Sequence, residues 1–198
     1  MLFRSNQHPK AQIGMIEEIV AMAGAVYVDG NVAALNNAKK EWDQGPAYSS
    51  NHYAEFNIFV DPLATKKVFD SSIPITLVPL DACNYVILQR KFMNRITATD
   101  PIAKLVKKIF DKKTGSSSEG IPVPIFDPLA TLIMADDLQP NQVNNLHLDV
   151  CLKEDPKNNH CGQTYINSFK SNKLIKVVQG VSGKEFKEVF SQTINSDL

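Results

Sequence analysis

Apolar positions along the chain follow two alternating spacings, and these spacings predict its elements. Continuous or period-two apolar runs are typical of strands. Such runs occur at 17–28, 54–60, 74–80, 121–126, 143–152, 163–169 and 173–179. Apolar residues at helical spacing follow Asp100-Pro101, and they also follow Ser182, which forms a capping box with Glu185. Because strand-like and helix-like segments alternate, the sequence predicts an α/β sheet protein.

One long segment has neither spacing. Residues 32–53 are polar and aperiodic, which indicates a surface loop or an insertion. No stretch has the pattern of an independent second domain. We therefore predict one domain over 1–198, with 32–53 as its surface insertion loop.

Composition narrows the classes of partner. The chain has 198 residues, 43% of them hydrophobic, which suits a globular protein with a real core. Lys+Arg and Asp+Glu are equal at 21 each, so charge favours neither nucleic acid nor an acidic membrane surface as a partner. Three scattered cysteines do not make a disulfide framework, and no apolar segment approaches the length of a membrane span. We expect a cytoplasmic protein with no nucleic-acid or membrane partner.

The pentapeptide Asp-Pro-Leu-Ala-Thr occurs twice, at 61–65 and at 127–131. An Asp at the N-cap followed by Pro at the first helical position is a strong helix-start signal, so both copies predict helices. The flanking residues do not match, which argues against an internal repeat. Each copy follows a strand-like run, and ligands in open α/β sheets bind at the carboxyl ends of strands. Either aspartate could therefore face a site, and local chemistry does not choose between them.

Four segments together resemble one known family. They are AMAGAVYVDGN (21–31), AEFNIFVDPLAT (54–65), PITLVPLDA (74–82) and IFDPLATLIMAD (125–136). In order and character they are similar to the nucleoside hydrolases that prefer inosine and uridine, and the similarity runs from about Ile16 to the C-terminus. The resemblance implies a mostly parallel, Rossmann-like sheet with flanking helices. It also implies calcium-assisted hydrolysis of the N-glycosidic bond of ribonucleosides to ribose and free base.

The resemblance implies a role for individual residues. Asp127 resembles a calcium ligand of the family, and Glu55 and Asn57 resemble a pair that hydrogen-bonds the ribose hydroxyls. We expect the side chains of Glu55 and Asn57 to lie on one face of a strand. Met22 resembles a methionine that packs near the sugar, and Asn31 resembles an asparagine that reaches the 5′-hydroxyl.

Each of these residues also has a purely structural interpretation. Met22 could be core, Asn31 a turn residue, and Glu55 with Asn57 an exposed strand face. Asp61 is expected only to cap its helix. Asp81, at another strand end, receives no role.

The chain departs from the family's pattern in two ways. Family members begin with an aspartate cluster of the form D-x-D-x-x-x-D-D, which supplies the base and most calcium carboxylates, and no such segment is present. Phe126 stands where relatives that prefer inosine and uridine carry a histidine, and it can stack on a base but cannot protonate one.

These departures predict an N-terminally truncated nucleoside hydrolase fold with no assigned catalytic residue. We expect weak calcium binding and slow or absent hydrolysis by this chain alone. The alternative is an inactive protein of this family that binds ribose or a nucleoside, or serves as an interaction module. We also expect either a homo-oligomer or a partner that covers the missing part. The base preference, purine or pyrimidine, stays open.

Overall fold

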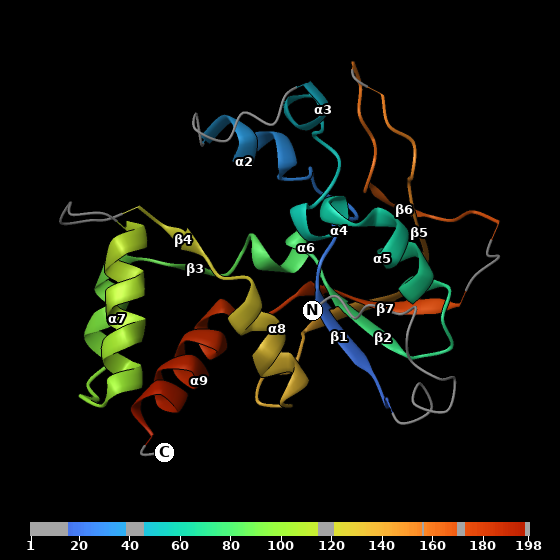
Figure 1. The fold of residues 1–198 in the computed structure, drawn as a ribbon. Coiled ribbons are helices and arrows are strands. Elements are labelled where there is room, and N and C mark those ends of the chain that lie inside the picture. The colour runs from blue at the N-terminus through green and yellow to red at the C-terminus, as the bar shows by residue number, and fades with distance from the viewer. Residues whose placement is uncertain (1–15, 39–45, 115–120, 156, 170–172, 197–198) are drawn as a thin grey trace. The chain divides into compact units, whose positions relative to one another are not determined.

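The computed structural model describes residues 16–38, 46–114, 121–155, 157–169 and 173–196. Figure 1 shows the helices and strands that these residues form. They belong to two compact units, the first within Met1–Asp81 and Gln142–Gln179 and the second within Ala82–Asn141 and Gly180–Leu198. The single domain expected from the sequence stays a prediction. Among the described helices, none combines the length and apolar character that a membrane span requires.

The first unit is built on a five-stranded sheet in the order β1-β2-β7-β5-β6. Its elements are β1 (Ile19–Met22), α2 (Val32–Ala38), α3 (Pro46–Ser49), α4 (Phe56–Val60), α5 (Pro62–Phe69), β2 (Ile75–Val78), β5 (Gln142–Val150), β6 (Thr164–Ile166) and β7 (Leu174–Gly180). Strand β2 pairs in parallel with both β1 and β7, and β5 pairs with β6 in antiparallel fashion. The predicted α/β fold class is confirmed, with a mixed sheet whose parallel strands are flanked by helices.

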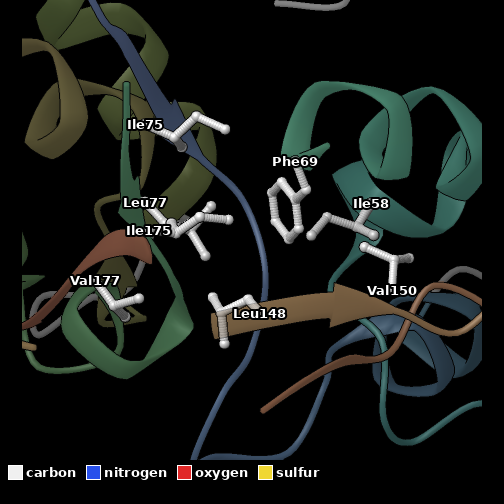
Figure 2. Close-up of a cluster of buried hydrophobic side chains, with 8 residues drawn as sticks. All are labelled: Ile58, Phe69, Ile75, Leu77, Leu148, Val150, Ile175 and Val177. Carbon is white, nitrogen blue, oxygen red and sulfur yellow. The ribbon is translucent and has the colours of Figure 1, made fainter. Parts of the chain in front are cut away.

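Strand β2 lies between β1 and β7, and all four of its residues are buried. This matches the largely apolar run at 74–80, since a strand covered on both faces favours apolar residues. The one polar residue of the strand, Thr76, donates its hydroxyl to Glu18. Figure 2 shows the core that forms on one face of the sheet. It consists of Ile58, Phe69, Ile75, Leu77, Leu148, Val150, Ile175 and Val177. Each such side chain contributes about 1.5–3 kcal/mol when fully buried. Because Ile58 belongs to α4, the core fixes α4 on the sheet.

The segment 54–60 is a helix, so its predicted strand is wrong. Helix α4 covers Phe56–Val60, and Glu55 is its N-cap residue. Glu55 and Asn57 therefore do not alternate along a strand face. An apolar run this short fits the spacing of a strand as well as that of a helix. The Glu55 side chain favours the helix, because it accepts a hydrogen bond from one of the free backbone N–H groups of the first turn.

Residues 32–53, predicted as a surface loop, contain helices α2 and α3. Val32 and Ala33 are each only 1% exposed. The Ala33 amide donates to the carbonyl oxygen of Asn51 at 2.9 Å, so packing against the end of the same segment organises it. Whether the segment is an insertion relative to the family stays a prediction.

The second unit contains the remaining elements. These are β3 (Ile87–Leu88), η2 (Arg90–Arg95), α7 (Pro101–Thr114), β4 (Val123–Pro124), α8 (Asp127–Met134) and α9 (Gly183–Asn195), and α6 (Leu80–Cys83) spans the boundary between the units. The predicted helices after Asp100-Pro101 and after Ser182 are confirmed, and the Ser182 hydroxyl accepts from the Glu185 amide as the capping box requires. The strand-like run at 121–126 gives only β4, which pairs with β3 in a separate two-stranded sheet.

The two copies of the pentapeptide begin helices at different positions. Asp61 is the N-cap of α5, and its carboxylate accepts from the Ala64 amide at 2.9 Å. In the second copy the N-cap is Phe126, and no side chain caps the helix. Asp127 already lies in the first turn of α8, so the prediction that it caps its helix is wrong.

Candidate functional site

Most of the predicted site residues lie at the carboxyl end of the parallel strands. Met22 is the last residue of β1, and it pairs with Val78, the last residue of β2. Two segments meet beyond these ends: residues 23–31, named here the β1 loop, and residues 51–57, named the α4 lead. The carboxyl edge of an open α/β sheet is the usual place for a ligand.

Asn57 lies in the first turn of α4 with an exposed side chain. Its amide nitrogen donates to the Met22 carbonyl oxygen at 3.1 Å and to the Met22 sulfur at 3.3 Å. Among the described residues, no group donates to Asn57 Oδ1. The side-chain amide is thus anchored at its nitrogen, and its carbonyl oxygen belongs to an exposed residue.

Glu55 lies just before α4 and is only 2% exposed. Its Oε1 accepts from the backbone amide of Asn57 at 3.0 Å, which caps the helix. Its Oε2 accepts from the backbone amide of Gly24 at 3.1 Å. A buried carboxylate is costly unless hydrogen bonds compensate for the lost water. One side chain therefore starts α4 and also ties the β1 loop to it.

Asn31 connects the other end of the β1 loop to the α4 lead. Its Oδ1 accepts from the Phe56 amide at 2.8 Å, and its own amide donates to the Ala54 carbonyl oxygen at 3.0 Å. The structure thus brings Met22, Asn31, Glu55 and Asn57 together, although they come from two segments far apart in sequence.

Sequence reasoning gave no role to two buried residues that organise this region. Asp81 is 4% exposed, and its two carboxylate oxygens accept from the Val26 and Tyr27 amides at 2.9 and 2.8 Å. Asn51 is fully buried, and its Oδ1 accepts from the Ala54 amide at 2.9 Å. The position of Asp81 at a strand end was a usable signal, whereas Asn51 sits in a polar stretch that offers none.

Phe126 and Asp127 belong to the second unit, whereas the other four predicted site residues belong to the first. Phe126 is half-buried, and its carbonyl oxygen accepts from the Leu129 and Ala130 amides at 3.1 and 3.3 Å at the start of α8. Asp127 is exposed, and its carbonyl oxygen accepts from the Thr131 hydroxyl at 2.9 Å.

The described residues do not fit a calcium ion. Calcium takes six to eight oxygen ligands, several of them carboxylates in most protein sites. Within the described ranges, no three His, Cys, Asp or Glu side chains lie close enough together to hold a metal. A single exposed carboxylate at Asp127 does not make such a site.

Comparison with known proteins identifies relatives of this fold and of these segments. A family model described as inosine-uridine preferring nucleoside hydrolase matches residues 5–188. Nucleoside hydrolase 3 of Arabidopsis thaliana is 58% identical over 45 residues, which are 23% of this chain and 5% of that protein. The pyrimidine-specific ribonucleoside hydrolase RihA of Shewanella baltica is 41% identical over 108 residues, which are 54% of this chain and 26% of that protein.

A solved structure agrees on the fold. The inosine-uridine preferring nucleoside hydrolase of Bacillus anthracis matches with a TM-score of 0.68 and 20% identity, over 92% of this chain and 52% of that one. The chain thus spans about half the length of that structure and about a quarter or less of the two curated relatives. Because the family model covers most of the chain, the chain belongs to the inosine-uridine preferring nucleoside hydrolase family.

Proposed function

We propose that this protein binds ribonucleosides, with the ribose held by Met22, Asn31, Glu55 and Asn57, and that hydrolysis of their N-glycosidic bond is impaired in this chain alone. The observation that carries the proposal is the Asn57 side chain. Its nitrogen is anchored on Met22, the last residue of β1, and the residue is exposed at the carboxyl edge of the sheet. An oriented amide oxygen is suited to accept a hydrogen bond from a sugar hydroxyl.

The charge of Glu55 suits the reaction as well as binding. Cleavage of an N-glycosidic bond leaves positive charge on the ribose ring in the transition state. A fixed carboxylate beside the ring stabilises that charge more than it stabilises the neutral substrate. Glu55 is held rigid by the two backbone amides that donate to it, so it needs no rearrangement as charge develops.

Departure of the base requires a proton donor other than Glu55. Phe126 offers a face for stacking but no proton, so protonation of the base would come from another donor or from solvent. RihA of Shewanella baltica is described as pyrimidine-specific, and RihC of Salmonella paratyphi A as non-specific. We therefore treat the base as a variable for experiment.

Binding tests the ribose site directly. Isothermal titration with inosine and with uridine should show that Asn57→Ala weakens affinity by about tenfold, since one hydrogen bond to a ligand is worth about 1–1.5 kcal/mol. Asn144→Ala is the matched control, because Asn144 is also exposed and its amide donates to Gln179 at 2.8 Å. Equal losses in the two variants would contradict the proposed site.

Turnover tests the hydrolytic part. We expect the purified chain to hydrolyse inosine, uridine and a nitrophenyl riboside slowly or not at all with added calcium, because the described residues do not make a calcium site. Turnover that disappears in Asp127→Ala would contradict this expectation. Slow turnover would support impaired hydrolysis, and binding with no detectable turnover would favour the alternative of a ribonucleoside-binding protein.

A further inference from the structure

Asp81 is a buried carboxylate for which the proposed ribose site has no use. It lies in α6, three residues after the end of β2, and is 4% exposed. Its oxygens accept from two consecutive backbone amides of the β1 loop, Val26 and Tyr27. An isolated buried charge is expensive, so these two hydrogen bonds keep the carboxylate in place and fix the loop at the same time.

We infer that Asp81 is a positioning residue that holds the β1 loop in the conformation in which Met22, Glu55 and Asn57 bind ribose. The inference rests on the proposed function, because the groups it positions are those proposed to hold the sugar. Among the described residues, the Asp81 carboxylate accepts hydrogen bonds only from the backbone of the β1 loop, so it acts through the loop and not on the substrate.

The hydrogen bonds of the β1 loop show how this would work. At one end the Gly24 amide donates to Glu55, and at the other the Gly30 amide donates to the His52 carbonyl oxygen at 2.8 Å. Both of these partners belong to the α4 lead. The middle of the loop is held instead by Asp81, which accepts from Val26 and Tyr27. Next to Asp81, the Leu80 amide donates to the Gly24 carbonyl oxygen at 2.9 Å.

The loop is therefore clamped between the α4 lead and the end of β2. Gly24 takes part in both halves of the clamp, since its amide reaches Glu55 and its carbonyl oxygen accepts from Leu80. Loss of the Asp81 hydrogen bonds would loosen the loop at Val26 and Tyr27. The disturbance would reach Glu55 through the shared residue Gly24.

Asp81→Asn tests this, because an amide keeps the shape but offers only one acceptor oxygen to two amide donors. Asp61→Asn is the matched control, since Asp61 also accepts from a backbone amide but caps α5 outside the clamp. Hydrogen exchange read by mass spectrometry should be about tenfold faster in Asp81→Asn, both in the β1 loop and at the amides of 55–57. Asp61→Asn should leave both segments unchanged.

A second measurement separates positioning from general loss of stability. The ratio of affinities for inosine and 2′-deoxyinosine reports on the groups that hold the ribose hydroxyls. We expect Asp81→Asn to lower this ratio several-fold, whereas partial unfolding would weaken both ligands equally. If Asp81→Asn does not fold, Asp81→Glu keeps both oxygens on a longer side chain and is read in the same way.

Exchange that rises in the β1 loop but not at 55–57, or an unchanged affinity ratio in a protein that binds inosine, would overturn the inference. If the unmodified chain binds no inosine, the proposed function fails, and the exchange data still decide whether Asp81 controls the α4 lead.

Discussion

At the scale of single residues, Gly30 lies where two stretches of backbone come unusually close. A Cβ atom at this position would meet the Ala54 carbonyl oxygen at 2.2 Å, far inside any normal contact. The obstacle is backbone, so no side-chain rotation relieves it. The close approach is also what lets the Asn31 amide reach the Ala54 carbonyl oxygen.

We predict that Gly30→Ala lowers the free energy of unfolding by more than about 2 kcal/mol, because the β1 loop must separate from the α4 lead. Gly183→Ala is the control, since a Cβ there would meet only the Tyr85 carbonyl oxygen at 3.8 Å, and it should be neutral or slightly stabilising. Urea denaturation measures both. Equal effects would show that the approach at Gly30 is not a tight constraint.

At the scale of elements, the two pentapeptide helices show that identical residues serve different purposes. In α5 the Asp61 carboxylate accepts a free amide of the first turn. In α8 the chain turns into the helix one residue earlier, so Asp127 contributes only its charge to the helix N-terminus.

We predict that Asp61→Ala costs about 1 kcal/mol of stability, as expected for a lost cap. Asp127→Ala should cost no more than a few tenths of a kcal/mol, since it removes only a charge near the helix dipole. Denaturation of the two variants in parallel provides the measurement. A larger loss for Asp127→Ala would mean that this carboxylate has a structural role that the helix does not explain.

Helix α5 is also held to the sheet by an ion pair. Lys66 Nζ lies 2.8 Å from Asp149 Oδ1, and the Asp149 side chain is only 16% exposed. Burial pushes the pKa of Asp149 upward, but hydrogen bonds from Lys66 and the Val150 amide outweigh burial and leave that pKa below its ordinary 3.8. The hydrogen bond to Asp149 raises the pKa of Lys66 above its ordinary 10.5.

The sign of these shifts sets a pH window. A lowered carboxylate pKa stabilises the fold above the unfolded value of 3.8, and the stabilisation is lost as pH falls through the folded pKa. The raised pKa of Lys66 gives stability that is full below 10.5 and is lost as pH rises through the folded value. The pair therefore contributes between these two limits.

We predict that Asp149→Asn costs about 1–2 kcal/mol at pH 7, and that its deficit shrinks once the pH falls below 3.8. Asp111→Asn is the control, because its 3.7 Å pair with Arg90 is exposed and should contribute little. Urea denaturation at a series of pH values follows both variants. A deficit for Asp149→Asn that stays constant with pH would assign its effect to packing instead of charge.

At the scale of the whole molecule, the described part of the chain has a core and the residues of the proposed ribose site but no grouped metal ligands. The core of the first unit joins helices α4 and α5 to β2, β5 and β7. Among the described residues, no carboxylates gather as a calcium site requires.

We predict that millimolar calcium leaves the Tm of this chain unchanged, because a ligand stabilises a fold only to the extent that the fold binds it. Thermal unfolding with calcium and with a chelator measures this. A saturable rise in Tm that is absent in Asp127→Ala would reveal a calcium site and contradict the prediction.

What the sequence by itself determined are features whose causes are local. The apolar run at 74–80 predicts β2, and the Ser182–Glu185 capping box predicts the start of α9. Both signals come from residues that are neighbours in the sequence. The family resemblance rests in the same way on contiguous segments. The family agrees with the match of the family model over residues 5–188, and the implied fold class agrees with the solved structure of the Bacillus anthracis enzyme.

Tertiary structure decided what depends on distant partners. Glu55 caps α4 through a local contact with the Asn57 backbone amide, but its second oxygen accepts from Gly24, 31 positions away in sequence. Asp81 likewise receives a role only because its partners Val26 and Tyr27 lie 55 and 54 positions away in sequence. Periodicity predicts the burial of each segment but not which segments lie together in space, and the candidate site is formed by segments that lie together.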